Sequence, residues 1–195
     1  MRYVAALTIL IALTALARLG AAAAEPTTQP AGKAPPGKGE RAAEFSLATL
    51  DGESVSLAKL VHDGPVVLIV LRGWPGYQCP ICTRQVADLI AHAKEIEKTG
   101  ARVLLVYPGP SEKLQEHAEE FRRGKGIPES FYFVIDPDYK FTNEYGLRWD
   151  APRETAYPSS FVIDRDGIVK FADISKTHGG RVAATTVVRE LDQLK

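Results

Sequence analysis

Residues 66–82 read VVLIVLRGWPGYQCPIC, an apolar run followed by a bend and then the only two cysteines of the 195-residue chain. The run is rich in β-branched side chains and does not alternate with polar residues, which is typical of a strand buried on both faces. A helix is predicted to begin at the Cys-Pro-Ile-Cys sequence, with Cys79 as its N-cap. Pro80 then lies in the first turn, where its missing N–H costs nothing, and Cys82 lies one turn further along the same face.

This placement predicts redox chemistry for the two cysteines. The unpaired amides and the positive dipole end of the helix stabilise a thiolate, so Cys79 is expected to be an exposed nucleophile near neutral pH. Cys82 is close enough to resolve a mixed disulfide and is expected to face the protein. A structural disulfide or half of a zinc site are the alternatives, but the four histidines are scattered and lack the short spacing of zinc modules.

The N-terminus has the features of a secretory signal. Met1-Arg2 is followed by an apolar run over residues 3–17, and Ala21 to Ala24 offer a small-residue cleavage site. We expect residues 1–24 to be removed, which places the mature protein in the periplasm or another extracytoplasmic space where disulfides can form. An uncleaved membrane anchor is the alternative, although the apolar run is shorter than the roughly 20 residues of a spanning helix.

Composition separates a linker from one domain. Residues 25–41 contain four prolines and three glycines and no large apolar side chain, so they are predicted to be a linker. Residues 42–195 are long enough for one compact domain. Without the two arginines of the signal, 22 basic and 24 acidic residues remain, a formal net charge of −2. This balance does not indicate nucleic acid as a partner.

The domain shows alternating strand and helix patterns that predict an α/β fold. A continuous or alternating apolar pattern predicts strands, whereas helical spacing predicts helices. The predicted elements are a hairpin over residues 45–57, a strand over 65–71, a helix over 80–98, a strand over 102–107, a helix over 111–123 capped by Ser111, a strand over 131–135, a short helix over 139–145, a hairpin over 160–171 and a helix over 181–194. This order implies a mixed sheet covered by helices on both faces, with an N-terminal β-hairpin.

Two motifs together resemble the thioredoxin fold in its redoxin branch, over residues 42–195. They are Trp74 shortly before the cysteines, and the sequence YPSSFVIDRDG that begins at Tyr157. The branch includes exported thiol/disulfide oxidoreductases and peroxiredoxin-like alkyl hydroperoxide reductase and thiol-specific antioxidant proteins. The resemblance implies a cis Tyr157-Pro158 bond packed against the cysteines, and a substrate groove at Trp74, Pro80, Tyr157 and Pro158, where the backbone of residue 157 pairs with a substrate strand.

The resemblance includes thiol peroxidases, whose motif is Pro-x-x-x-(Thr/Ser)-x-x-Cys. Pro75 and Cys82 fit this motif, but Cys79 stands where a hydroxyl would orient the peroxide, and a thiol is a poorer hydrogen-bond donor. Peroxiredoxins also use an arginine that precedes the Phe-x-Ile-Asp strand by three residues, and this position holds a proline. Arg72 and Arg153 are the candidates to replace it.

We therefore expect a thiol/disulfide oxidoreductase that acts through Cys79 and Cys82, with a peroxiredoxin-like thiol peroxidase, in which Cys82 or Cys79 is the peroxidatic residue, as the alternative. Its partners are expected to be protein or small-molecule disulfides, or peroxides in the alternative, together with an external thiol as electron donor, and no cofactor or metal is expected. A copper-delivery protein that binds through Cys79, Cys82 and His178 is a further alternative, because exported thioredoxin-fold proteins of that class use a cysteine pair and a distant histidine.

Overall fold

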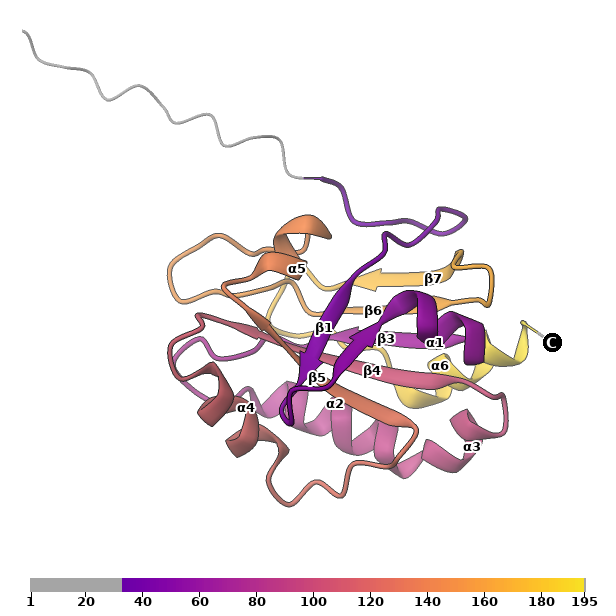
Figure 1. The fold of residues 1–195 in the computed structure, drawn as a ribbon, viewed down its shortest axis with the longest axis horizontal. Helices are drawn as coiled ribbons and strands as arrows, with labels where there is room; N and C mark the ends of the chain where they lie inside the picture. The colour runs from indigo at the N-terminus through magenta and orange to yellow at the C-terminus, as the bar shows by residue number, and fades with distance from the viewer. Residues whose placement is uncertain (1–32, 195) are drawn as a thin grey trace, which may run out of the picture. The chain divides into compact units, whose positions relative to one another are not determined.

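The computed structural model describes residues 33–194, and a single seven-stranded mixed sheet forms their centre (Figure 1). The strand order is β2-β1-β5-β4-β3-β6-β7. In chain order, the strands are β1 (Ser46–Thr49), β2 (Ser54–Ser56), β3 (Val66–Val70), β4 (Arg102–Gly109), β5 (Phe131–Pro137), β6 (Ser159–Ile163) and β7 (Val169–Ile174). The parallel strands β3, β4 and β5 lie in the middle, and β1 and β6 pair antiparallel on either side of them.

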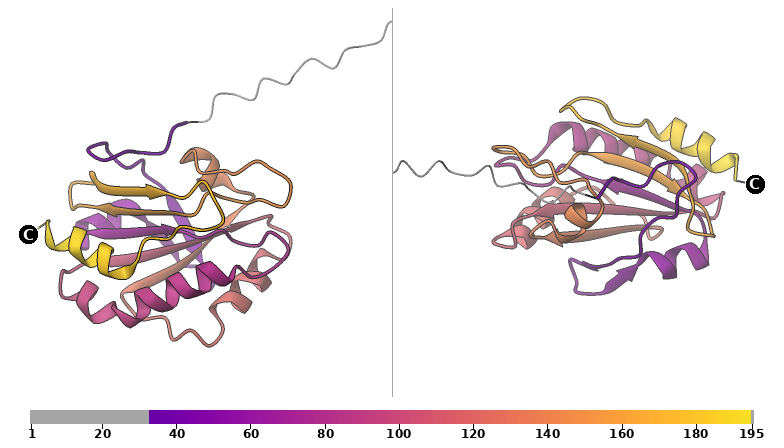
Figure 2. Two further views of the ribbon diagram at one scale, coloured as in Figure 1. Left: turned by 180° about the vertical axis from the view of Figure 1, so that it is seen from behind. Right: turned by 90° about the horizontal axis from the view of Figure 1, so that it is seen from above.

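Helices cover both faces of this sheet, as the sequence predicted. The helices are α1 (Leu57–Asp63), α2 (Pro80–Ala91), α3 (Ala93–Glu97), α4 (Leu114–Arg122), α5 (Lys140–Glu144) and α6 (Ala184–Asp192). Side chains of α2, α3, α4 and α6 form one core with alternate residues of β3 and β4, whereas α1 and α5 form the second core on the opposite face. Figure 2 shows α2 and α6 together on the face turned away from α1. All five residues of β3 are buried, which explains its unbroken apolar run.

Several boundaries differ from the prediction for local reasons. The predicted helix over residues 80–98 is divided at His92, whose backbone leaves helical geometry with φ −100° and ψ 13° although its amide still donates to the Asp88 carbonyl at 3.2 Å. Ser111 is not the N-cap of α4, because its amide binds Asp138 and the helix begins after Lys113. Helix α1 was not predicted at all, although Ser56 caps it by accepting a hydrogen bond from the Lys59 amide.

The segment before β1 contacts the end of the sheet. Residues 33–41 belong to the predicted linker, yet the Gly39 amide donates to the Val169 carbonyl and the Val169 amide donates to the Glu40 carbonyl. The described end of the linker is therefore fixed to β7. The predicted signal segment lies outside the described residues. Within residues 33–194 no helix combines the length and apolarity needed to cross a membrane.

Candidate redox site

The two cysteines lie at the N-terminus of α2, after the loop that follows β3. Cys79 is the N-cap of α2, its sulfur accepts a hydrogen bond from the Cys82 amide at 3.3 Å, and Pro80 occupies the first turn. Both thiols are free. These positions agree with the prediction, but the expected exposure of Cys79 is wrong: Cys79 is 4% exposed and Cys82 0% exposed. The reason is that both residues pack into the core beneath α2, beside the partly buried Trp74.

The local environment makes the two thiols unequal. The pKa of Cys79 is lowered to about 5, chiefly because the Cys82 thiol donates to its thiolate, with further help from the Cys82 and Ile81 amides and the Arg181 charge. The pKa of Cys82 is raised well above its usual value, because its proton is held by Cys79 and because the residue is buried. The pair therefore shares one proton over a wide pH range, with the negative charge on Cys79.

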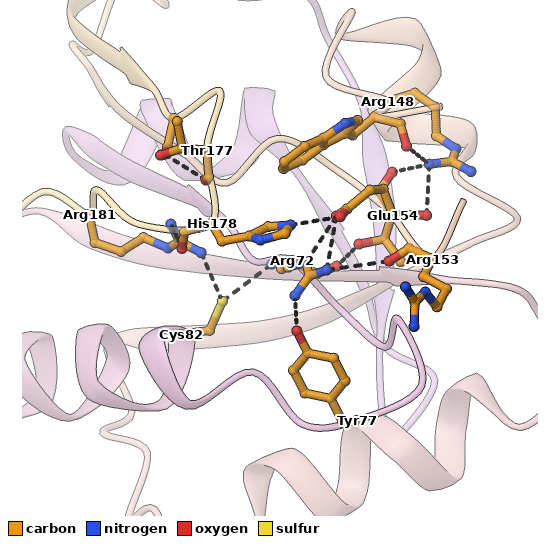
Figure 3. A network of polar contacts seen from close by, with 12 residues as sticks. Arg72, Tyr77, Cys82, Arg148, Arg153, Glu154, Thr177, His178 and Arg181 are labelled. Carbon is orange, nitrogen blue, oxygen red and sulfur yellow. Dashed lines mark hydrogen bonds and ion pairs between the residues drawn. The ribbon is translucent and has the colours of Figure 1, made fainter. Parts of the chain in front are cut away.

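Two donors reach the Cys82 sulfur (Figure 3). The backbone amide of Arg72 and the guanidinium Nη2 of Arg181 each lie 3.5 Å from Sγ. Arg72 lies two residues after the end of β3, whereas Arg181 comes from the loop between β7 and α6. Once Cys82 loses its proton, both donors can stabilise the resulting sulfur anion.

A buried ion pair lies beside these donors. Glu154 Oε2 accepts from Nε and Nη2 of Arg72 at 3.1 and 2.9 Å, and the two side chains are only 9% and 5% exposed. The other oxygen, Oε1, lies 2.7 Å from Nε2 of His178. Arg72 Nη1 also donates to the Tyr77 hydroxyl, and the Thr155 hydroxyl donates to the Arg72 carbonyl. Glu154 thus joins the end of β3 to the loop that carries His178.

That same loop carries Arg181, so its conformation decides how the guanidinium reaches Cys82. Arg181 Nη1 donates to the carbonyls of residues 178–180, and the Ser175 hydroxyl donates to carbonyls of the same loop. His178 also lies against Trp149, with 5.2 Å between ring centroids. The loop is therefore fixed at Glu154 on one side and folded around Arg181 on the other.

The predicted groove residues are only partly brought together. Trp74 stacks on His117 at 3.9 Å, and Pro80 is exposed at the start of α2. Tyr157 stacks on Trp149 at 4.9 Å, and Pro158 is buried. Tyr157 and Trp149 therefore belong to the aromatic cluster around His178, while Trp74 belongs to the contact between the cysteine loop and α4.

The expected cis bond before Pro158 is not found. No peptide bond in residues 33–194 is cis, so Tyr157-Pro158 is trans, the isomer that an X-Pro bond ordinarily prefers. The backbone of residue 157 is also occupied, because its amide donates to the Leu147 carbonyl and its carbonyl accepts from the Ser159 hydroxyl. An added substrate strand cannot pair there without displacing these bonds.

The residues proposed for copper do not come together. Among the side chains of residues 33–194, no three histidine, cysteine, aspartate or glutamate groups are placed to hold one metal ion. His178 is held instead by Glu154. The predicted copper-binding set of Cys79, Cys82 and His178 is therefore wrong, because His178 does not join the two cysteines.

The arginine beside Cys82 was sought at the wrong positions. Arg72 reaches the sulfur through its backbone amide, and Arg153 makes no hydrogen bond to it, whereas the guanidinium of Arg181 does. Glu154 was also missed, since an isolated glutamate in a loop carries no motif. The one available signal for Arg181 was its Gly-Gly-Arg context after the last strand, which indicates a tight loop but not its direction.

Both the sequence and the fold are similar to those of known proteins. The AhpC/TSA family matches residues 38–172, well over half of the chain. The chain belongs to the AhpC/TSA family. It is an oxidoreductase with the thioredoxin-like fold of peroxiredoxins, as the sequence predicted.

The similar proteins include relatives named as peroxiredoxins and relatives named as thiol-disulfide oxidoreductases. A putative peroxiredoxin of Mycobacterium tuberculosis is 28% identical over 150 residues, covering 74% of this chain and 89% of the relative. The thiol-disulfide oxidoreductase ResA of Halalkalibacterium halodurans is 27% identical over 158 residues, covering 80% and 77%. The crystal structure of peroxidoxin BcpB from Mycobacterium tuberculosis superposes with a TM-score of 0.64 at 22% identity, covering 82% of this chain and 99% of that one.

Proposed function

We propose that this AhpC/TSA protein is an exported thiol/disulfide oxidoreductase that exchanges disulfides through Cys79 and Cys82. The observation that carries the proposal is the asymmetry of the pair: the pKa of Cys79 is lowered to about 5, while that of Cys82 is raised. A thiolate at neutral pH beside a thiol that keeps its proton is what a nucleophile and its resolving partner require.

The exchange proceeds in two steps that conserve electrons. The Cys79 thiolate attacks one sulfur of a substrate disulfide, forms a mixed disulfide and expels the other substrate sulfur as a thiolate. Cys82 then loses its proton, and its sulfur attacks Cys79, which closes the Cys79–Cys82 disulfide and releases the second substrate thiol. Two electrons pass to the substrate, and an external dithiol must return them. The Arg72 amide and Arg181 stabilise the Cys82 anion during the second step.

A peroxidase is the second candidate, and the donors around Cys82 favour it. Cys82 occupies the position of the peroxidatic cysteine in the motif that begins at Pro75, and Arg181 Nη2 lies 3.5 Å from its sulfur. Attack of a thiolate on hydrogen peroxide gives a sulfenic acid and water, and Cys79 would then condense with it to the disulfide. The hydroxyl that would orient the peroxide is nevertheless replaced by Cys79, and losing one preorganised donor costs on the order of a hundredfold in rate.

Stopped-flow oxidation of the reduced protein distinguishes the two candidates. We would follow tryptophan fluorescence after mixing with equal concentrations of hydrogen peroxide or a peptide disulfide. We expect the disulfide to react faster, with Cys79→Ser abolishing the reaction and Cys82→Ser stopping at a mixed disulfide that mass spectrometry detects. A fast peroxide reaction that survives in Cys79→Ser and disappears in Cys82→Ser would instead make the protein a peroxidase.

Export is the part of the proposal that rests on residues 1–24 alone. The charged start, the apolar run and the small residues before Glu25 support it. Mass spectrometry of protein purified from the cell envelope tests it, with a mature N-terminus at Glu25 as the expected result. A chain that keeps Met1 and remains in the membrane fraction would indicate an anchor, and one recovered from the cytoplasm would contradict export.

A further inference from the structure

A cavity of about 410 Å³ lies beside the redox pair and is not used by the exchange chemistry. Its walls are the Pro75–Tyr77 segment before α2, the Pro152–Glu154 segment before β6, Arg72 and His178. It adjoins the redox pair through Arg72, whose backbone amide binds the Cys82 sulfur. A space of this size suits a small molecule rather than a folded protein.

The charge of the cavity lining is positive because it contains two guanidiniums, those of Arg72 and Arg153, and one carboxylate, that of Glu154. Both oxygens of Glu154 are taken, Oε2 by Arg72 and Oε1 by His178. Arg153 adds a second guanidinium, which is exposed and makes no hydrogen bond or ion pair with another side chain of residues 33–194. Figure 3 shows this guanidinium on the Tyr77 side of the Arg72–Glu154 contacts. A free fork of donors thus remains in a positively charged recess.

The backbone that presents Arg153 is strained. Its φ is +62°, in the left-handed region that residues other than glycine seldom adopt. Its carbonyl accepts from Nη2 of the buried Arg72, which helps to hold this conformation. Strained residues of this kind concentrate at ligand sites, where the surrounding structure keeps a side chain in place.

The opposite wall offers an apolar surface. Tyr77 is 50% exposed, the highest exposure of any large hydrophobic residue within 33–194. Its hydroxyl accepts from Arg72 Nη1, and the Arg72 guanidinium lies 5.3 Å from its ring centroid. The ring is therefore fixed in place yet open to a ligand. Tyr77 lies two residues before Cys79 in the chain, and Arg72, which fixes its ring, also binds the Cys82 sulfur through its backbone amide.

We propose that this cavity binds the carboxylate of a small anionic disulfide, with Arg153 as its ligand-binding residue. The inference rests on the proposed function and names its substrate class. A planar guanidinium fork matches a carboxylate in two parallel hydrogen bonds, and the Tyr77 ring covers the carbon chain that leads to the sulfur atoms. Protein disulfides have no need of such a recess.

Three disulfides of similar length and different charge test the proposal. The reduced protein is mixed with 3,3′-dithiodipropionate, which is anionic, with bis(2-hydroxyethyl) disulfide, which is neutral, and with cystamine, which is cationic. Loss of protein thiols is followed by acid quench, alkylation and mass. We expect saturation with the anionic disulfide and a half-saturating concentration at least tenfold below that of the neutral one. Cystamine should be the poorest substrate.

The variant that isolates the site is Arg153→Gln. It should raise the half-saturating concentration of the anionic disulfide about tenfold, leave its maximal rate unchanged and leave the neutral disulfide unaffected, while Arg153→Lys keeps part of the preference. Arg123→Gln, at an exposed arginine after α4, is the matched control and should change nothing. An unchanged preference in Arg153→Gln would overturn the proposal.

A binding measurement separates this inference from the proposed function. 3,3′-Thiodipropionate carries the same carboxylates on a thioether that cannot exchange, so calorimetry reports binding without chemistry. Binding by the parent protein that is lost in Arg153→Gln supports the site, and no binding by the parent overturns it. If none of the three disulfides oxidises the cysteines while thiodipropionate binds, the redox proposal fails and the anion site stands.

Discussion

At the scale of single residues, the sulfur of Cys79 has a different environment from that of Cys82. Cys79 receives the Cys82 thiol, two backbone amides and the Arg181 charge, which lower its pKa to about 5. We expect its alkylation rate to reach half of its maximum near pH 5, whereas an ordinary cysteine does so near pH 8.5. Rapid labelling with iodoacetamide followed by peptide mass spectrometry measures this. Labelling of Cys82 before Cys79 would reverse the roles of the two residues.

The same shift predicts a pH dependence of stability for the reduced protein. Because the folded pKa of Cys79 lies below its unfolded value, the unfolded chain binds more protons between about pH 5 and pH 9. The free energy of unfolding should therefore rise with pH across this window, by on the order of 1 kcal/mol per pH unit at most. The stability that Cys79 contributes is lost as the pH falls toward 5. Urea denaturation of the reduced parent and of Cys79→Ser compares the two slopes. Equal slopes would contradict the shifted pKa.

Glu154 is predicted to be a positioning residue. Glu154→Gln keeps the size but leaves Arg72 buried without a counter-charge, which should lower the free energy of unfolding by about 3 kcal/mol. It should also release the His178 loop, draw Arg181 from Cys82 and raise the pH midpoint of Cys79 labelling. His178→Gln removes only the contact between His178 and Glu154. It should also raise the pH midpoint of Cys79 labelling, with a smaller loss of stability. Midpoints unchanged in both variants would reduce Glu154 to a purely structural role.

The cysteines could be predicted from sequence because their chemistry is local. Cys79, Pro80 and Cys82 lie within one helical turn, and N-cap geometry fixes their relation without reference to the rest of the chain. Glu154 and Arg181 lie 72 or more positions away along the sequence from Cys82, and only tertiary packing brings them to it. The burial of Cys79 was missed for the same reason, since it depends on what packs over α2.

At the scale of elements, the connection from β3 to α2 depends on one glycine. Gly73 has a φ of +71°, and a Cβ there would lie 1.8 Å from the Pro108 carbonyl oxygen at the end of β4. Gly73→Ala should therefore cost about 2 kcal/mol or more of stability and shift the loop that leads to Cys79. Denaturation and Cys79 labelling check both effects. Gly76→Ala is the matched control, because its φ is also positive but no atom lies within 4 Å of the added Cβ.

The predicted elements show which local signals suffice. The β-branched run of β3 and the Asp51-Gly52 turn between β1 and β2 identified strands correctly, because burial and turn chemistry agree with the sequence pattern there. Helix α1 was missed, because Val55 and Leu57 extend the alternation of the preceding strand and only the Ser56 cap marks the change. The division at His92 is a local change of backbone angles and could not be seen from periodicity.

At the scale of the whole molecule, the Cys79 thiolate affects the reduction potential of the Cys79–Cys82 disulfide. A stabilised Cys79 thiolate favours the reduced form, so the disulfide should be a stronger oxidant than one with an ordinary thiol. Thioredoxin-fold dithiols extend from about −270 mV, with a nucleophile pKa of about 7, to about −120 mV, with a pKa of about 3.5. We expect this protein to lie between these limits. Equilibration against glutathione, read by alkylation, measures the potential, and a value below −270 mV would contradict the argument.

The loop between β7 and α6 has a consequence for how relatives of this chain are classified. Its arginine reaches Cys82 from the loop after β7, whereas the position at which the peroxiredoxin motif has an arginine lies just before β6, so a guanidinium arrives from another column of an alignment. A comparison made column by column would score Pro158 as the loss of an active-site residue. Where a protein carries proline there and a Gly-Gly-Arg sequence after the final strand, the arginine of that loop should be considered before an active-site cation is counted as lost.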